Sequence, residues 1–202
     1  MINVFGKQIS ELLGHVYVAC VDLEATCDDT PGFDRSSMEI IEFGCTLLNP
    51  AYEVVGTMNS FVRPTINPTL TKFCKELTTI TQEDVDGAGT WAEVAAEIQA
   101  YFKDAIPDGA TVIWVSWGDY DDNQIRKDNV RHKISSPMPM QHFNLKKLEA
   151  SHRNSKKQHG LRGTLTSMGM TFPGTQHRAG DDALAVAMIL QKLGSGLVRS
   201  KL

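Results

Sequence analysis

Three groups of acidic residues stand where an apolar run ends or where a helix is expected to begin. Asp22 and Glu24 close the stretch "VYVACVDLE", and because residues two apart in a strand project to the same side, both carboxylates should leave one face of a hydrophobic layer. The other groups lie in "GDYDD" (118–122) and "HRAGDD" (177–182). Carboxylates held side by side repel one another unless a positive charge lies between them, so the pattern indicates a cation site.

Each group also has an ordinary structural explanation. Asp is a preferred residue at helix N-termini, where the partial positive charge of the helix stabilises it, and Asp181 is our candidate for such a cap. Asp22 and Glu24 would also fit a solvated strand end, and His177 an ordinary loop histidine. Because all three acidic groups lie where a strand ends or a helix begins, we favour a shared function over three separate structural explanations.

The elements that must position these residues alternate between strands and helices. Strands are expected over residues 15–22, 39–48, 52–62 and 110–117, with a short fifth near 140–144. The second and third should form an antiparallel hairpin through "NPAY". The fourth, "ATVIWVSW", is almost entirely apolar, which is typical of a strand covered on both faces. The pattern predicts an α/β fold with a mixed five-stranded sheet and helices on both faces.

Helices are expected from apolar residues at helical spacing. The first carries Leu70, Phe73 and Leu77 after a proline-containing turn. The clearest is "TWAEVAAEIQAYF" (90–102), with Thr90 as N-cap and Glu93 three residues further on. Others are expected near 119–131, 144–152, 161–168 and 182–193.

Length and composition favour one domain. With 202 residues, 42% of them hydrophobic, the chain is long enough to bury a single core. We expect one domain covering residues 1–202, with its core over about residues 14–193. No apolar run approaches the ~20 residues of a membrane span, and "MINVFGKQIS" lacks the plan of a signal peptide. The four cysteines form no CxxC pair, which favours reduced, mostly buried thiols. We expect a soluble, cytoplasmic protein without a membrane partner.

The formal charge of −4 conceals a basic segment. Residues 126–162 contain ten Lys or Arg against Asp128 and Glu149, a net charge of +8, and the rest of the chain carries −12. A basic face on an acidic body suggests a polyanionic partner such as nucleic acid. The solvated faces of two helices would explain the charges equally well.

Three motifs together resemble those of the DEDDh 3′-to-5′ exonucleases: "DLEAT", then "YDDNQI", and then a His with an Asp five residues later in "HRAGDD". Longer stretches, among them "EIIEFGCTLLNP" and "HGLRGTLTSMGMTFPGTQHRAGDD", resemble the catalytic domain of the branch that includes the three-prime histone mRNA exonuclease and its RNA-interference relatives. The resemblance covers roughly residues 14–193 and implies a ribonuclease-H-like sheet whose first strand is central.

The resemblance also implies roles for individual residues. Four carboxylates would bind metal and His177 would be the general base, with the ligands at Asp22, Glu24, Asp121 and Asp182. Asp119 and Asp122 are neighbours of Asp121, which is preferred because Tyr120 and Ile125 occupy the flanking aromatic and aliphatic places of the motif. Contacts to the terminal nucleotide would come from Leu23, Ala25, Thr26, Phe73 and Tyr120. Phe73 also fits the apolar stripe of its own helix.

The expected chemistry is phosphodiester hydrolysis assisted by two Mg²⁺ or Mn²⁺ ions, since hard oxygen ligands suit these ions better than zinc. His177 would take a proton from water, a task suited to imidazole. We expect single-stranded RNA 3′ ends to be degraded to nucleoside 5′-monophosphates. The alternatives are a DNA exonuclease of the same fold and a nucleic-acid-binding module that has lost catalysis, whose signature would be a missing carboxylate or His; none is missing. A purely structural protein would leave the acidic residues unexplained. Relatives acting on histone message carry an extra amino-terminal domain, so that specialised substrate is not expected.

Overall fold

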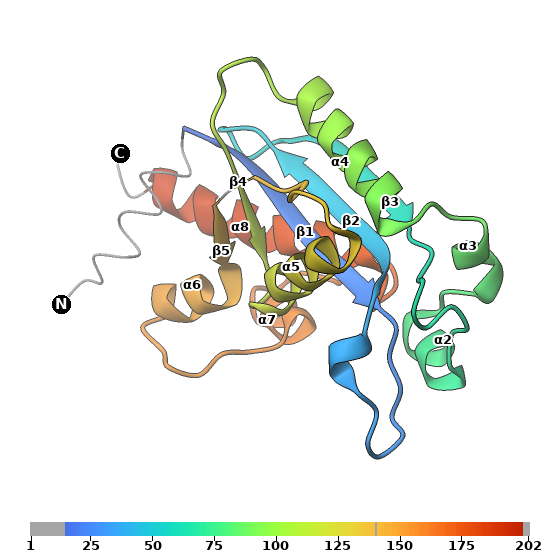
Figure 1. Ribbon diagram of the computed structural model, residues 1–202. Coiled ribbons are helices and arrows are strands. Elements are labelled where there is room, and N and C mark those ends of the chain that lie inside the picture. The colour runs from blue at the N-terminus through green and yellow to red at the C-terminus, as the bar shows by residue number, and fades with distance from the viewer. Residues whose placement is uncertain (1–14, 140, 200–202) are drawn as a thin grey trace.

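A five-stranded mixed sheet forms the centre of the computed structural model, which describes residues 15–139 and 141–199 (Figure 1). The strands are β1 (Tyr17–Ala25), β2 (Ile40–Leu48), β3 (Val54–Phe61), β4 (Val112–Ser116) and β5 (His142–Asn144). Their order is β3-β2-β1-β4-β5, with β1–β2 and β2–β3 antiparallel and β1–β4 and β4–β5 parallel. The predicted sheet, its β2–β3 hairpin and its central first strand are therefore confirmed.

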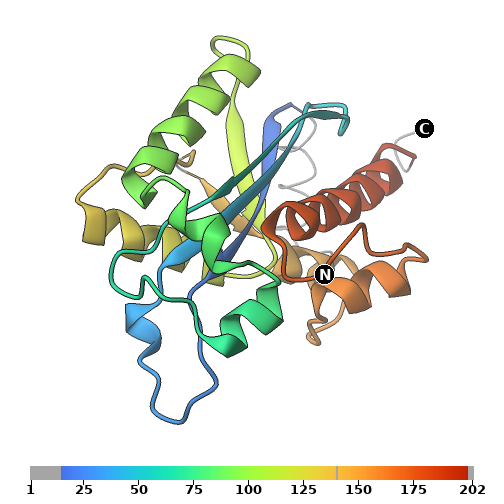
Figure 2. The same ribbon diagram turned by 90° about the vertical axis from the view of Figure 1, so that its right-hand side faces the viewer.

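Helices cover both faces of this sheet. They are α2 (Lys72–Thr78), α3 (Gln82–Asp86), α4 (Trp91–Ala105), α5 (Tyr120–His132), α6 (Leu145–His152), α7 (Leu161–Ser167) and α8 (Ala179–Arg199), with a 3₁₀ turn at Arg35–Ser37. Helix α8 packs on β1 and β2, whereas α4 lies on the opposite face, as Figure 2 shows. Helix α4 begins as predicted, because the Glu93 carboxylate accepts hydrogen bonds from both the backbone N–H and the hydroxyl of Thr90.

The alternation of side chains along β1 directs its two acids toward α8. Val18 and Cys20 pack in the cluster that includes the apolar face of α8, whereas Val21 packs in the cluster beneath α4. Because side chains two apart share a face, Asp22 and Glu24 continue the row of Val18 and Cys20. Both carboxylates therefore lie on the α8 side of the central strand.

Strand β1 is longer than predicted at its carboxyl end. The sequence suggested an end at residue 22, but pairing with β2 continues through Glu24 opposite Glu42 to Ala25 opposite Ile40, with an irregularity between Glu24 and Ala25. The neighbouring strand extends the ladder although the acids break the apolar pattern. Glu24 is thus held inside the sheet rather than in a loop.

Helix α8 begins three residues before the predicted position. Its start lies against Gly44 of β2: a Cβ placed there would be 2.1 Å from the carbonyl oxygen of Ala179, so only glycine permits this approach. The prediction that Asp181 is the N-cap is wrong, because Asp181 lies inside the first turn. Its carboxylate instead accepts a hydrogen bond of 2.7 Å from the backbone N–H of Thr175 in the preceding loop.

The predicted apolar stripe near residue 73 is also wrong in part. Leu70 is buried but precedes α2, and Leu77 is 36% exposed, whereas Cys74 and Thr78 form the buried face of that helix. Helix α3 was not predicted from the sequence; its first turn is closed by reciprocal hydrogen bonds between Thr81 and Asp84. Such a short helix carries too little periodicity to be recognised from apolar spacing.

All four cysteines are free thiols, and those at positions 20, 45 and 74 are buried. Within the described ranges, no helix combines the length and the hydropathy needed to cross a membrane. Residues 1–14, over which no signal peptide is predicted, and residue 140, the first of the predicted fifth strand, lie outside the described residues.

Candidate metal centre

Three of the predicted ligands converge at the carboxyl end of β1. Asp22, Glu24 and Asp182 each offer a carboxylate oxygen, and these oxygens all lie within 4.8 Å of one another. Two come from the central strand and the third from the first turn of α8, which the close contact at Gly44 seats on the sheet. Residues 160 positions apart in the sequence are thereby brought into one group.

Asp121, in the first turn of α5, lies beside this group, although it is not one of the three residues whose oxygens lie within 4.8 Å of one another. Its side chain is 5% exposed, and its negative charge raises the pKa of Asp22, although burial is the larger cause. The two alternatives point elsewhere: Asp119 binds Lys147 at 2.6 Å and Asp122 binds Arg126 at 2.8 Å. The structure therefore brings Asp121, and neither neighbour, to the acidic cluster.

Burial, together with mutual repulsion, makes the carboxylates of the cluster hard to ionise. Burial, with the charges of Asp182 and Glu42 next, raises the pKa of Glu24 from 4.5 to about 8. Burial also raises the pKa values of Asp121 and Asp182, each to about 6, and holds that of Asp22 well above its ordinary value. Carboxyl groups that resist ionisation in the same pocket are typical of a site completed by positive charge.

His177 lies at the edge of the cluster. Its Nδ1 atom is 3.9 Å from Oε1 of Glu24, and its side chain is 43% exposed. Its backbone N–H donates a hydrogen bond of 2.7 Å to Oδ2 of Asp182, so the loop before α8 is attached directly to a predicted ligand. The imidazole can therefore reach both the carboxylates and solvent.

The donor set fits a hard divalent cation. The converging groups are all carboxylates, which are the ligands that Mg²⁺ and Mn²⁺ prefer, and no thiolate belongs to the group. Arg178, the strong cation next to His177 in the sequence, is bound by Glu42 and does not neutralise the cluster. A metal ion would offset both the burial and the repulsion that raise these pKa values.

The three predicted nucleotide contacts after Asp22 are buried. Leu23 packs in the cluster beneath α4, and Leu23, Ala25 and Thr26 are each 5% exposed or less. The Thr26 hydroxyl accepts a hydrogen bond from the backbone N–H of Glu39. These three residues lie near Asp22 and Glu24 because they are their neighbours in the sequence. Their contact with a nucleotide stays a prediction.

The two predicted aromatic contacts are accessible. Tyr120 is 46% exposed at the start of α5, immediately before Asp121, and the Asp121 and Glu24 charges add to burial in raising its pKa. Phe73 is half-buried on α2 and lies outside the hydrophobic clusters of the described residues. The alternative that Phe73 belongs to the core is therefore not supported.

Two residues beside the cluster, Glu42 and Arg178, were not predicted from the sequence. Glu42 is fully buried on β2, and its charge contributes to the raised pKa values of Glu24 and Asp182. Its partner is Arg178. The available signal was an acid in the middle of the apolar strand "EIIEFGCTLL".

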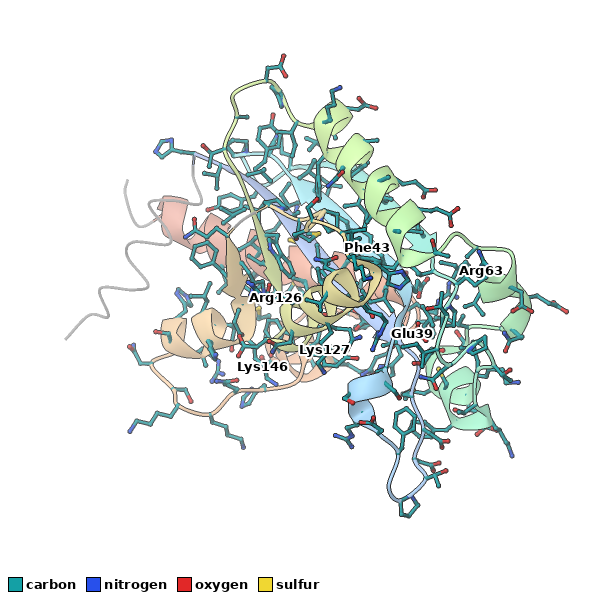
Figure 3. The ribbon with its side chains drawn as sticks, viewed as in Figure 1. Glu39, Phe43, Arg63, Arg126, Lys127 and Lys146 are labelled. Carbon is teal, nitrogen blue, oxygen red and sulfur yellow. The ribbon has the colours of Figure 1, made fainter. Side chains whose placement is uncertain are left out.

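The basic segment 126–162 is only partly free of internal partners. Salt bridges engage four of its ten basic residues: Arg126, Arg131, Lys147 and Arg153. The other six form no salt bridge with a residue in the described ranges. Figure 3 labels three of the segment's basic residues, Arg126 and Lys127 on α5 and Lys146 on α6. Roughly half of the predicted positive charge therefore remains available to an anionic partner.

This sheet, with acids at the end of its central strand and at the start of the helix packed on it, defines the class of ribonuclease-H-like nucleases. A family model described as "Exonuclease" (RNase_T) matches residues 19–190, and the chain belongs to that family.

Individual relatives and solved structures show which branch of the family this chain resembles. Human 3'-5' exoribonuclease 1 is 30% identical to this chain, and the match covers 88% of this chain and 52% of the relative. Mouse ERI1 exoribonuclease 2 is also 30% identical, and that match covers 95% of this chain and 30% of the relative. The chain thus spans about half or less of these curated relatives. A solved structure of the nuclease domain of 3'hExo, a DEDDh family member, bound to rAMP, is 28% identical with a TM-score of 0.82, covering 90% of this chain and 93% of that one. The predicted resemblance to this DEDDh branch is confirmed.

Proposed function

We propose that this protein is a divalent-metal-dependent exonuclease that degrades single-stranded RNA from its 3′ end and releases nucleoside 5′-monophosphates. The observation that carries the proposal is the convergence of Asp22, Glu24 and Asp182, with His177 beside Glu24. The relatives named as exoribonucleases favour RNA over DNA. The rAMP bound to the similar nuclease domain is a nucleoside monophosphate, as is the proposed product.

The carboxylates of Asp22, Glu24, Asp121 and Asp182 would hold two Mg²⁺ or Mn²⁺ ions. Such ions, when bound, acidify water and neutralise charge on phosphate oxygens. The protein contributes acceptor-only ligands on two rigid elements, the central strand and α8, together with the start of α5. This arrangement keeps the ligands in place before substrate arrives.

His177 would act as general base on the attacking water. The water oxygen forms a bond to the terminal phosphorus as its proton passes to the imidazole, and the bond from phosphorus to the 3′ oxygen of the preceding nucleotide breaks. That oxygen takes a proton from solvent, leaving a strand one nucleotide shorter with a free 3′ hydroxyl. The exposed edge of the His177 side chain allows the imidazole to return its proton to solvent.

Phe73 and Tyr120 would flank the terminal base. Tyr120 precedes the metal ligand Asp121 on α5, and both rings are partly exposed. Stacking on an aromatic side chain contributes about 1–3 kcal/mol per base and tolerates any sequence, as a general exonuclease requires. Leu23, Ala25 and Thr26 would line the floor beneath the nucleotide through their backbone atoms.

The proposal is tested with matched end-labelled RNA and DNA oligonucleotides, single- and double-stranded, incubated with Mg²⁺, Mn²⁺ or EDTA. We expect single-stranded RNA to shorten from the 3′ end with release of nucleoside 5′-monophosphates, and no reaction in EDTA. Preferential degradation of DNA would support the alternative substrate. Binding without cleavage in either metal would contradict the enzymatic proposal, and full activity in EDTA would contradict the role of metal.

A further inference from the structure

Glu42 is a fully buried carboxylate that lies beside the acidic cluster without belonging to it. It stands opposite Glu24 in the β1–β2 ladder and faces α8, as Gly44 does two residues later. The carboxylates whose oxygens all lie within 4.8 Å of one another are those of Asp22, Glu24 and Asp182; neither Glu42 nor Asp121 is among them, so what sets Glu42 apart is its bonding partners. A buried charge in this position requires an explanation, because burying a carboxylate is costly unless it is paired and hydrogen-bonded.

Both oxygens of Glu42 are occupied by donors from outside β2. Oε1 accepts hydrogen bonds from Nη2 of Arg178 at 2.8 Å and from Nδ2 of Asn59 at 2.9 Å. Oε2 accepts one from the backbone N–H of Ala179 at 2.9 Å, and Nε of Arg178 lies 3.2–3.3 Å from the two oxygens. With these bonds made, the side chain has little capacity left to bind a metal ion.

Two of these partners immediately follow His177. Arg178 is the next residue, and Ala179 begins α8, so Glu42 fixes the chain one and two positions beyond the predicted base. The guanidinium of Arg178 also lies over the ring of Phe61, 5.3 Å from its centroid. This second contact limits the orientations that Arg178 can adopt.

The backbone of His177 needs such support. Its φ angle is +64°, in the left-handed region that a residue with a Cβ rarely adopts. A strained backbone of this kind persists only where surrounding contacts hold it. On one side the contacts are the hydrogen bond from His177 to Asp182, and on the other the bonds that Glu42 makes to Arg178 and Ala179.

We propose that Glu42 is a positioning residue for catalysis, which acts through Arg178 and the start of α8 to hold His177 beside the acidic cluster. The inference rests on the proposed function, since it assigns Glu42 to the same reaction. Glu42 touches neither substrate nor metal in this role. Its loss should therefore lower the rate of the chemical step by more than any accompanying change in metal affinity or substrate binding explains.

The test is a double-mutant cycle between Glu42→Gln and His177→Ala. The amide of Gln keeps the size of the side chain but removes its charge and places an N–H₂ group against N–H donors. Because a misplacement of 1 Å can cost about 10²-fold, we expect Glu42→Gln to lower the single-turnover rate about 10- to 100-fold. In the His177→Ala background the same change should cost less than about 3-fold, since no base remains to be misplaced.

Glu149→Gln is the matched control. Glu149 is also fully buried and bound by an arginine, Arg153, but this pair lies at the C-terminal end of α6. Both Gln variants should lose thermal stability, whereas only Glu42→Gln should slow cleavage. Arg178→Lys keeps a charge but not the planar fork, and it should reproduce the rate loss if Glu42→Gln does not fold.

Three results would overturn the inference while leaving the proposed function intact. The first is an unchanged cleavage rate in both Glu42→Gln and Arg178→Lys. The second is a rate loss on Glu42→Gln that is the same with His177 present and in the His177→Ala background. The third is a loss of Mn²⁺ affinity in Glu42→Gln that accounts for its slower rate. A wild-type protein that cleaves no strand would overturn the proposed function instead, and the inference with it.

Discussion

Replacing Glu24 with Gln should stabilise the metal-free protein at high pH even though it removes a metal ligand. The folded protein holds the pKa of Glu24 at about 8, against an ordinary value of 4.5. Between these values the folded state binds more protons than the unfolded state, so stability falls as pH rises through this window. A neutral Gln at position 24 removes this penalty.

The size of the effect follows from the pKa difference. A rise of about 3.5 pKa units, at about 1.4 kcal/mol each, corresponds to about 5 kcal/mol at or above pH 8. This is an upper bound, because the cluster carboxylates share the repulsion and the remaining ones relax when one is neutralised. We expect a gain of about 2–4 kcal/mol at pH 8 and less than about 1 kcal/mol at pH 5.

The assay is urea unfolding in EDTA at half-unit steps from pH 5 to pH 8, for wild type and Glu24→Gln. Glu97→Gln, on the exposed face of α4, is the control for removing a carboxylate without relieving the cluster, and it should show no gain that grows with pH. Added Mn²⁺ should then stabilise wild type more than Glu24→Gln, since metal stabilises the state that binds it. A gain independent of pH, or a loss of stability at pH 8, would refute the electrostatic reasoning.

Three further outcomes are expected. Asp121→Asn should lower Mn²⁺ affinity and cleavage at least 10-fold, whereas Asp122→Asn should change both less than about 2-fold, measured by titration and single-turnover rates. Charge reversal at Lys156 and Lys157 should weaken binding to long strands and reduce the slope of log affinity against log salt concentration by about 2, while leaving the binding of a dinucleotide unchanged. An unchanged slope would mean that both lysines lie on a solvated face and do not contact the strand. Gly44→Ala should destabilise the protein by more than about 2 kcal/mol in urea, because its Cβ meets the carbonyl at the start of α8.

Local patterns were sufficient for most of the fold. Period-two and period-3.6 spacing located the five strands and most helices, and the "NPAY" turn determined that the second and third strands pair antiparallel. The same patterns misplaced the end of β1 and the start of α8. In both cases a contact between distant segments extends the element: the ladder to β2 for β1, and the approach at Gly44 for α8.

The sequence by itself also supplied the candidate residues of the site. The spacing of Asp22, Glu24, His177 and Asp182 carries the resemblance, because the types and order of residues near one another in the chain are visible without a fold. What spacing left open was the choice within "GDYDD". Successive residues of a helix point about 100° apart, so only the orientation of α5 against the sheet decides that Asp121 faces the cluster.

The tertiary structure alone decided how the site is supported. Glu42 and Arg178 are 136 residues apart, and nothing in the spacing around either predicts that they meet. Their contact exists because β2 lies beside β1 and α8 crosses both strands. Local sequence determines which groups are available for chemistry, whereas packing between remote segments determines which of them lie within hydrogen-bonding distance, because hydrogen bonds and charge repulsion depend on distance in space.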